Sequence, residues 1–384
     1  MCKIMLSAGE ASGDLHGAGI AAALRALNPD VRLFGMGGAA MRREGVDILY
    51  DIADLGVIGL VEVLKNLPRL FRLRDDLAAA MDREKPDILV TIDYPGFNMR
   101  LAKIAKAKGI RVVSYIAPSV WAWGEWRAKG VVRSVDHIAS IFPFEAELYR
   151  RYGGKVTYVG HPLLDLVGTK RNTAEARAFL KLQPQERIVL LLPGSRKQEI
   201  KSLLPLFLQA ARQVAAAVPE AVFVLPLAST VTEDMVQPAL QAAGVPVRLV
   251  REHLYDWMQA AETAMAASGT VTLEAALMNL PCVVTYKVNP LTYGLGKLLV
   301  KLPYISLPNI IAGRQVVPEL VQNEAQPQRL AAEVEKYLQD AEYCAATHRA
   351  LEEVRHKLGE SGAVQRVAAL ILAEASGNGR KANE

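Results

Sequence analysis

Two loops of small residues, one in each half of the chain, have the composition of anion-binding sites. The first is Ala8-Gly-Glu-Ala-Ser-Gly-Asp14, which follows the apolar run 3–7, and the second is Pro193-Gly-Ser-Arg-Lys197, which follows the run 187–192. Backbone amides exposed between a buried strand and the positive end of a helix dipole suit a phosphate group. Two such loops predict two half-molecules that face a common cleft.

A third segment could bind the rest of a nucleotide. Residues 266–276 have the pattern of a strand end, a turn at Ser268-Gly269-Thr270 and a helix that contains Glu274. Glu274 could accept hydrogen bonds from two ribose hydroxyls while the turn amides meet phosphate oxygens. The same residues also fit a capped helix, in which Ser268 or Thr270 caps and Glu274 only favours the first turn. The residue types alone leave these two interpretations level.

Two glycine patterns raise the alternative of an NAD-linked dehydrogenase. Residues 17–22 and 35–40 both satisfy a relaxed GxGxxA pattern. The first would lie inside a helix, and the second lacks a convincing following strand with a ribose-binding acid at the usual distance of about 20 residues. Close helix packing or a tight turn is the favoured interpretation of both.

Short apolar runs alternate with longer helical patterns along the chain, and these are the elements that must position the loops. Near-continuous apolar strands between helices are typical of parallel sheets covered on both faces. The sequence therefore predicts an α/β fold with two Rossmann-like, doubly wound domains. The predicted strands are 3–7, 31–35, 87–92, 110–116 and 137–142, then 187–192, 221–226, 245–250, 263–267 and 282–286.

The 384 residues, 51% of them hydrophobic, can bury two cores of ordinary domain size. A polar stretch between the two sets of strands predicts one domain over 1–165 and a second over 166–345. The remaining residues, 346–384, predict helices that can pack back on the first domain and a disordered tail. A homodimer, with or without exchange of the terminal helices, stays open.

Composition narrows the possible functions. A net charge of +5, from 45 basic and 40 acidic residues, favours anionic ligands or lipid surfaces only mildly and is far from that of a nucleic-acid-binding protein. Three cysteines without CxxC spacing predict neither disulfides nor a zinc site. No apolar run approaches the roughly 20 residues of a membrane span. We expect a cytoplasmic protein.

Six motifs resemble those of the lipid-A-disaccharide synthases, in that family's order and over nearly the whole chain. The resemblance implies a GT-B glycosyltransferase with its active site between two Rossmann-like domains. It implies an inverting hexosyl transfer from UDP-2,3-diacylglucosamine to 2,3-diacylglucosamine 1-phosphate, which gives the β-1,6-linked lipid A disaccharide 1-phosphate and UDP. The motifs are Ser7-Ala-Gly-Glu-Ala-Ser-Gly-Asp14, Ile92-Asp-Tyr-Pro-Gly-Phe-Asn98, Ala117-Pro-Ser-Val-Trp-Ala-Trp123, Tyr158-Val-Gly-His-Pro162, Leu192-Pro-Gly-Ser-Arg196 and Ser306-Leu-Pro-Asn309.

Given this resemblance, Asp93 is the expected base that deprotonates the acceptor 6-hydroxyl. It follows a predicted strand, at the sheet edge where open α/β folds place their ligands. Its alternative role is an Asx turn that shapes residues 94–96. Glu10 is the competing base, and it could instead favour a helix N-terminus or bind a sugar hydroxyl.

Departing UDP needs positive compensation, and the chain has no Asp-x-Asp pair for a metal. We therefore expect no metal or other cofactor, and a clamp made by Arg196 with Gly194, Ser195 and the 268–270 turn. Arg196 could otherwise be a solvated first-turn residue opposed by Glu199.

Five more residues are expected to bind substrate. Asn98 is expected at the acceptor, Tyr255 and Met258 beside the uracil, and Asn309 at the diphosphate or sugar, with Ser12 in the first loop. The alternatives are a helix cap for Asn98, helix packing for Met258 and a loop turn for Asn309.

Residues 55–74 are expected to dock on the cytoplasmic face of the inner membrane as a peripheral contact, because the substrates are lipids. Apolar residues at helical spacing alternate there with Lys65, Arg69, Arg72 and Arg74. A core-facing amphipathic helix interrupted at Pro68 is the alternative. The tryptophans 121, 123 and 126 fit either acyl-chain contact or packing.

Two rival functions share the second-domain pattern. One is another GT-B enzyme, a transferase or epimerase, that uses a UDP-N-acetylhexosamine. The other is a non-catalytic protein that binds a nucleotide sugar or a membrane. The first-domain motifs favour the synthase over the first rival. The second rival would keep Arg196 and Glu274 but need no base, so measured turnover separates it from the synthase.

Overall fold

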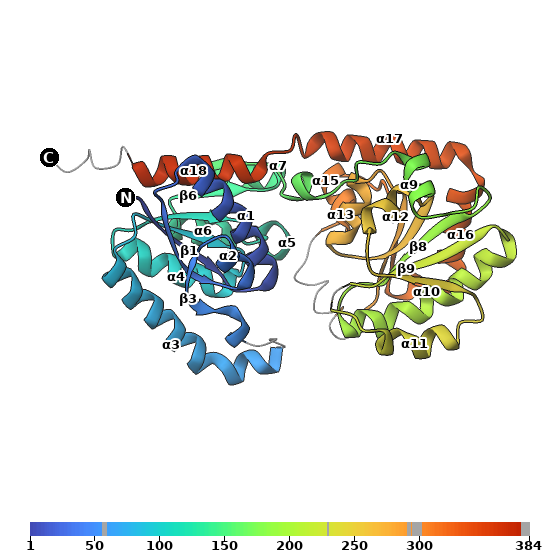
Figure 1. Cartoon of the computed structure of the whole chain (residues 1–384), viewed down its shortest axis with the longest axis horizontal. Coiled ribbons are helices and arrows are strands. Elements are labelled where there is room, and N and C mark those ends of the chain that lie inside the picture. Colours follow the sequence, from blue (N-terminus) through green and yellow to red (C-terminus); the bar gives the residue numbers. More distant parts are fainter. Residues whose placement is uncertain (56–59, 229, 290–292, 294–301, 378–384) are drawn as a thin grey trace. The chain divides into compact units, whose positions relative to one another are not determined.

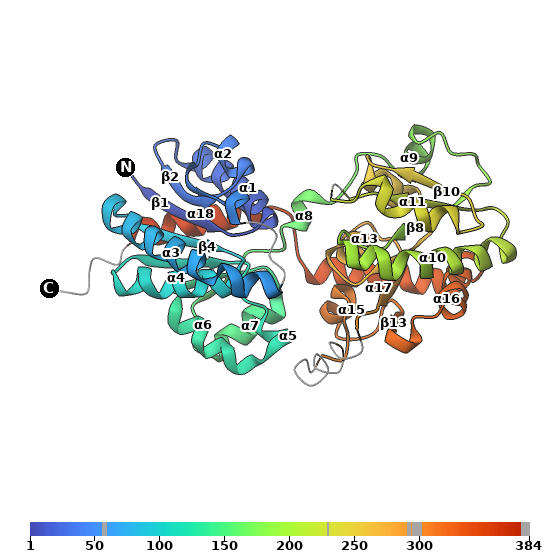
Figure 2. The same ribbon diagram turned by 90° about the horizontal axis from the view of Figure 1, so that it is seen from below.

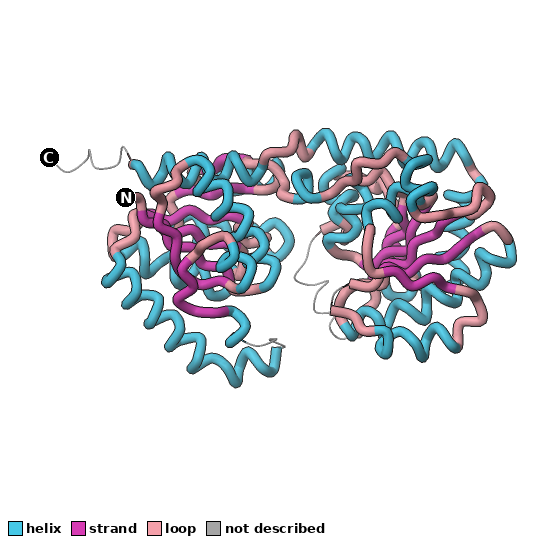
Figure 3. The backbone as a smooth tube through the Cα atoms, in the orientation of Figure 1, coloured by secondary structure: helices cyan, strands magenta, loops and turns pink. Residues whose placement is uncertain are grey.

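The computed structural model describes residues 1–55, 60–228, 230–289, 293 and 302–377, and the side chains of 54–67 and 123 are outside the description. The chain divides into two compact units (Figure 1). Unit 1 contains Met1–Asp165 and Glu360–Glu384, and unit 2 contains Leu166–Gly359. Each unit holds its own parallel sheet (Figure 3). This confirms the predicted α/β fold of two parallel-sheet domains.

The sheet of unit 1 has seven strands in the order β3-β2-β1-β4-β5-β6-β7, and neighbouring strands are parallel throughout. The order reverses between β1 and β4, so the loops after these two strands lie at a switch point, where open α/β sheets bind ligands. Glu10 follows β1 and Asp93 follows β4. The strands are β1 Lys3–Ala8, β2 Arg32–Gly37, β3 Asp47–Asp51, β4 Ile88–Ile92, β5 Arg111–Tyr115, β6 His137–Ser140 and β7 Val156–Tyr158.

Helices cover both faces of this sheet. Helices α1 and α18 pack side by side on one face, and α3 and α4 pack on the other (Figures 1 and 2). Helix α3 presents Leu73, Leu77 and Met81 to the core. The elements are α1 Ala11–Leu27, α2 Ala39–Arg43, η1 Ile52–Leu55, α3 Leu60–Glu84, α4 Pro95–Ala107, α5 Val120–Trp123, η2 Glu125–Arg127, α6 Ala128–Ser134, α7 Pro143–Arg151, α8 Leu163–Leu166 and α18 Ala363–Ser376.

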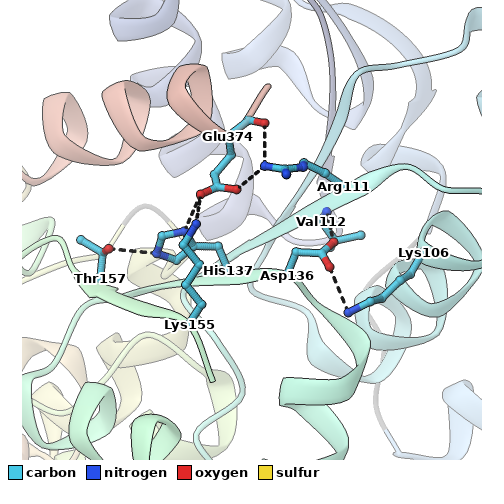
Figure 4. Close-up of polar contacts among 8 residues, drawn as sticks. All are labelled: Lys106, Arg111, Val112, Asp136, His137, Lys155, Thr157 and Glu374. Atoms are coloured by element: carbon cyan, nitrogen blue, oxygen red, sulfur yellow. Dashed lines mark hydrogen bonds and ion pairs between the residues drawn. The ribbon is translucent and has the colours of Figure 1, made fainter. Parts of the chain in front are cut away.

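Helix α18 is fixed to the sheet by one buried carboxylate (Figure 4). Glu374 accepts hydrogen bonds from Arg111 at 2.8 Å and Lys155 at 2.5 Å, and it lies 3.0 Å from Nδ1 of His137. The other ring nitrogen of His137 is 2.9 Å from the Thr157 hydroxyl. Burial opposes ionisation of Glu374, but the hydrogen bonds from Lys155 and His137 outweigh it and hold the pKa of Glu374 below its usual value.

Replacing Glu374 with glutamine should lower the stability of unit 1 by about 2–3 kcal/mol, because charge-assisted hydrogen bonds are lost. Guanidinium unfolding measures this change.

The folded-state pKa of Glu374 is depressed, so its contribution to stability is present above the ordinary carboxylate pKa of about 4.3 and is lost as pH falls through the folded value. The difference in unfolding free energy between Glu374→Gln and wild type should therefore decrease at acid pH. The exposed control Glu44→Gln should change stability by less than about 0.5 kcal/mol. An equal loss in both variants would contradict the role of the cluster.

Unit 2 has a six-stranded parallel sheet in the order β10-β9-β8-β11-β12-β13. Here the order reverses between β8 and β11, and the loops after these strands are the second and third predicted ligand loops. The strands are β8 Arg187–Leu192, β9 Ala221–Pro226, β10 Val247–Val250, β11 Thr263–Ala267, β12 Cys282–Tyr286 and β13 Glu319–Val321. The helices are α9 Thr173–Phe179, α10 Lys197–Ala217, α11 Glu233–Gln241, α12 Leu254–Ala260, α13 Thr270–Leu277, α15 Leu307–Ala312, η3 Gln322–Glu324, α16 Pro327–Gln339 and α17 Ala341–Lys357.

The two C-terminal helices belong to different units. Helix α17 packs against α13, α15 and α16 of unit 2, whereas α18 packs against α1 of unit 1. The expectation that helices from residue 346 onward return to the first domain is therefore wrong for α17. Its buried residues Thr347, Ala350, Leu351 and Val354 give it an apolar face, which unit 2 covers.

Candidate functional site

The corner between β4 and α4 has an unusual backbone. Asp93 has φ of 49° and Tyr94 has φ of 51° and ψ of 53°, so two consecutive non-glycine residues are left-handed. Each such residue costs about 1–3 kcal/mol, and such strained residues cluster at functional sites. The carboxylate of Asp93 accepts no hydrogen bond from the described residues, so the Asx turn offered as its alternative is absent.

His16 lies near this corner and His161 lies near His16, and the sequence analysis singled out neither. Burial lowers the pKa of His16 against the opposing charge of Asp93, and its ring meets Tyr115 edge-on with centroids 6.3 Å apart. Burial, with a smaller effect of His16, lowers the pKa of His161 to about 3. Nδ1 of His161 accepts the Leu163 amide at 3.2 Å. Burial therefore favours the neutral form of both imidazoles. Their positions inside or just after two of the family motifs were the available signal.

The first glycine loop packs on the strained corner. A Cβ added at Gly9 would lie 2.1 Å from the Tyr94 ring, so only glycine permits this approach. Burial raises the pKa of Tyr94, and the negative charge of Glu10 adds to the shift. Glu10 is the N-cap residue of α1, and Ser12 is exposed in its first turn. Glu10, Ser12 and Asp93 thus share one end of the unit 1 sheet.

The glycine pattern at 35–40 already holds an anion, which is the carboxylate of Asp14. Its Oδ1 accepts the amides of Gly38 at 2.7 Å and Met41 at 3.0 Å, and its Oδ2 accepts the amide of Ala40 at 2.9 Å. These amides form the N-terminus of α2, the place a dinucleotide pyrophosphate would need. The pattern is therefore structural, and this removes support for the dehydrogenase alternative.

The predicted acceptor contact Asn98 is corrected by the structure. Its side chain is 0% exposed, lies inside α4 and is used entirely within the protein. Nδ2 donates to the carbonyls of Asp93 at 2.7 Å, Ser7 at 3.1 Å and Ile92 at 3.3 Å, and Oδ1 accepts the Ser7 hydroxyl at 2.7 Å. It is neither a ligand contact nor a helix cap.

The predicted diphosphate or sugar contact Asn309 is corrected in the same way. It is fully buried in α15, where Oδ1 accepts the amides of Val316 at 2.7 Å and Val317 at 3.0 Å. Nδ2 donates to the Val317 carbonyl at 2.9 Å and to Glu319 at 2.8 Å. Glu319 also accepts the Ser306 hydroxyl at 2.6 Å. The Ser306–Asn309 motif therefore fixes α15 to the start of β13.

In unit 2, the amides of the loop after β8 donate hydrogen bonds to a carboxylate, that of Glu199. Gly194 has φ of +103°, and a Cβ there would lie 2.2 Å from Oε2 of Glu199. That oxygen accepts the amides of Ser195 at 3.1 Å and Arg196 at 3.2 Å, and the other oxygen pairs with the Arg196 guanidinium at 3.0 Å. Arg196 remains 83% exposed. The loop thus presents donors that an anionic ligand could share with Glu199 or take from it.

The loop after β11 lies beside the previous one, because β8 and β11 are paired. Gly269 is the N-cap of α13 without any side-chain cap, so neither Ser268 nor Thr270 plays the capping role offered as their alternative. The Ser268 hydroxyl donates to the Ile305 carbonyl at 2.9 Å, while Gly269 and Thr270 are exposed. The loop therefore offers backbone donors at a helix N-terminus.

Glu274 lies close enough to Tyr255 for its charge to act on the phenol. Burial raises the pKa of Glu274, and burial with the charge of Glu274 raises the pKa of Tyr255 to about 12. Both side chains are partly exposed. Met258, by contrast, is only 1% exposed and packs in the core, as its alternative predicted. The structure thus places Tyr255 near Glu274, whereas the burial of Met258 favours its packing role over contact with the uracil.

The expected docking segment 55–74 falls partly outside the described residues. Over 68–74, Leu73 is buried and Phe71 is 42% exposed between Arg69 and Arg72. The guanidinium of Arg74 lies 5.1 Å from the centre of the Phe71 ring. Among the tryptophans, Trp121 packs edge-on against Phe142 and Phe144, Trp126 is 78% exposed and the side chain of Trp123 is not described.

Within the described part of the chain, no helix has the length and apolar character needed to cross a membrane. The described residues also contain no group of three His, Cys, Asp or Glu side chains that could hold a metal ion.

Comparison with solved structures identifies the fold. A putative UDP-N-acetylglucosamine 2-epimerase from Listeria monocytogenes has a TM-score of 0.67 at 14% identity, covering 96% of this chain and 95% of its own. The glycotransferase of kitacinnamycin has a TM-score of 0.62 at 15% identity, covering 97% and 98%. At these identities the likeness shows the fold alone, which is GT-B.

Comparison with known sequences identifies the family as well as the fold. Residues 4–373 match the lipid-A-disaccharide synthetase family. The lipid-A-disaccharide synthases of Geobacter sulfurreducens and Trichlorobacter lovleyi are each 45% identical over 370 residues, covering 96% of this chain and 96% and 97% of theirs. Because both kinds of match span nearly the whole chain, it belongs to the lipid-A-disaccharide synthase family of glycosyltransferases.

Proposed function

We propose that this protein joins UDP-2,3-diacylglucosamine to 2,3-diacylglucosamine 1-phosphate and releases UDP. Family membership supports the role in lipid A synthesis. The observation that carries the proposal is the carboxylate of Asp93, which lies at the switch point of unit 1 with no hydrogen bond from the described protein. A carboxylate held in this way can accept a proton from a substrate hydroxyl.

The proposed reaction is a single in-line displacement. Asp93 takes the proton of the acceptor 6-hydroxyl as that oxygen forms a bond to the anomeric carbon of the donor. The bond from this carbon to the diphosphate oxygen breaks, its electron pair leaves with UDP, and the anomeric centre inverts to give the β-1,6 linkage. Glu10 binds a sugar hydroxyl at the same sheet edge or serves as the base in place of Asp93.

The leaving group is proposed to bind in unit 2. The amides of the 193–197 and 268–270 loops meet the diphosphate oxygens, and Arg196 adds a charge-assisted hydrogen bond as negative charge develops. The diphosphate then replaces or shares the contacts that Glu199 makes with the first loop. Glu274 accepts hydrogen bonds from the ribose hydroxyls, and the neighbouring Tyr255 contacts the uracil.

We propose that the reaction needs no metal. The support is the donor set, since a guanidinium and several amides provide the positive compensation that a divalent cation supplies in other transferases.

Incubation of the purified protein with both acylated sugars, with and without EDTA, tests this proposal. Mass spectrometry should detect UDP and the disaccharide 1-phosphate at the same rate in both samples, and no UDP when the acceptor is omitted. Loss of turnover in EDTA, restored by magnesium, would refute metal independence. Turnover of UDP-N-acetylglucosamine without the acylated sugars would refute the substrate assignment.

We also propose that unit 1 docks peripherally on the cytoplasmic face of the inner membrane through the exposed side of α3. Phe71 and the arginines around it combine an aromatic group with positive charge, which suits anionic lipid. The double variant Phe71→Ser with Arg72→Glu should reduce co-sedimentation with phosphatidylglycerol vesicles about tenfold, since each basic residue contributes about 1 kcal/mol. Arg349→Glu, an exposed change in unit 2, should bind as wild type does. Equal binding of all three proteins would contradict docking through α3.

A further inference from the structure

The left-handed corner at Asp93 and Tyr94 requires something to hold it. Left-handed backbone persists at non-glycine residues only when the surrounding structure imposes it. Tyr94 is the N-cap residue of α4, and its carbonyl accepts the amide of Asn98 at 3.0 Å. The corner therefore lies directly between a buried strand and a helix, and Asn98 lies one turn further along.

The peptide groups of Asp93 are held on both sides. Its N–H donates to the carbonyl of Tyr115 on β5 at 3.1 Å, and its carbonyl accepts Nδ2 of Asn98 at 2.7 Å. The same amide nitrogen also donates to the carbonyl of Ser7, at the end of β1, and to that of Ile92, at the end of β4. One side chain thus joins the two strands on either side of the switch point.

Ser7 orients the amide of Asn98. Its hydroxyl donates to Oδ1 of Asn98 at 2.7 Å, which directs Nδ2 toward the three carbonyls. Ser7 and Asn98 are both 0% exposed, so water does not compete for the hydrogen bonds of their side chains. With Nδ2 facing only acceptors and Oδ1 facing a donor, asparagine is the residue whose shape and polarity fit this position.

We propose that Ser7 and Asn98 are positioning residues that keep Asp93 left-handed and so direct its carboxylate toward the substrate. This inference rests on the proposed role of Asp93 as the base. The strain stored at the corner is then part of the site's pre-organisation, and Asn98 affects the reaction only through Asp93. A displacement of about 1 Å at a reacting group can reduce a rate about 100-fold.

A double-mutant cycle tests the inference. Asn98→Ala should lower kcat about 30- to 100-fold while the donor KM changes less than about twofold, because the residues proposed to bind the nucleotide lie in unit 2. In the Asp93→Asn background, the same change should lower kcat by less than about twofold, since the group it positions is already lost. The milder Ser7→Ala should follow the same pattern with about a tenfold loss, and the half-exposed control Asn28→Ala should act as wild type does.

Equal losses from Asn98→Ala in both backgrounds, or an unchanged kcat, would overturn the inference. A crystal structure of Asn98→Ala separates this failure from failure of the proposed function. We expect Asp93 to leave the left-handed region, and retention of its φ near the present value would overturn the positioning role whatever reaction the protein performs. If wild type makes no disaccharide, the proposed function fails and the conformation of Asp93 in the variant alone decides the inference.

Discussion

Asp93→Asn should reduce disaccharide formation by at least about 10³-fold, because asparagine cannot accept the proton of the acceptor hydroxyl. The substitution keeps the shape of the side chain. The two hydrogen bonds that hold the corner use the backbone of Asp93, so they should survive the change. The expected loss is therefore in kcat, measured as the rate of UDP release at saturating concentrations of both sugars.

Binding of UDP provides the matched measurement. Calorimetry should give nearly the same affinity for Asp93→Asn and wild type, because the residues proposed to hold UDP belong to unit 2. Asp30→Asn, the same change at an exposed position of unit 1, should leave turnover unchanged. Substantial turnover in Asp93→Asn, together with its loss in Glu10→Gln, would assign the base to Glu10. Equal loss of turnover and of UDP affinity in Asp93→Asn would contradict a role confined to proton transfer.

Arg196→Ala should lower kcat about 10²- to 10³-fold and weaken UDP binding, because we propose that the guanidinium stabilises charge that develops on the leaving diphosphate. Its side chain is anchored only by Glu199 among the described residues and is otherwise exposed, so its removal should leave the fold intact. Arg196→Lys should recover part of the loss, since lysine keeps the charge without the two-pronged geometry.

Arg349→Ala is the control for this experiment, because it removes an exposed arginine from α17 of the same unit. Its kcat and UDP affinity should match those of wild type. If Arg196→Ala behaved like this control, Arg196 would be the solvated first-turn residue offered as its alternative. If it lost UDP binding with no further loss of kcat, it would bind the ground state and transition state equally.

The sequence predicted most of the fold because the central strands are continuous apolar runs. Strands β1, β4, β8 and β11 carry this signal and are confirmed, and their order places the loops that follow them at the two switch points. Edge strands β3 and β13 were missed. β3 contains Asp47 and Asp51, and β13 is only three residues long. Such strands depend on pairing with a neighbour, which local composition does not report.

The candidate site was predictable where function follows from the backbone. Gly9 and Gly194 each allow an approach that a Cβ would block, and both lie in loops identified from residue type alone. The asparagines were not predictable in the same way. Asn98 and Asn309 have the residue type of ligand contacts, but tertiary packing gives each a full set of internal partners.

Asp14 is a second case in which tertiary structure, and not residue type, decides what a motif binds. The glycine pattern at 35–40 does form an anion-binding helix N-terminus, as its residue types indicated. The anion it binds is a carboxylate from α1, more than 20 residues earlier in the chain. A motif can predict a set of donors, but the three-dimensional structure decides whether a ligand or the protein itself fills it.

A crystal structure of the protein with UDP tests the account most directly. The account predicts that the diphosphate lies against the amides of residues 194–196 and 268–270, with the Arg196 guanidinium on its oxygens and Glu274 on the ribose hydroxyls. A nucleotide bound elsewhere, with Glu199 still holding the amides of Ser195 and Arg196, would contradict it.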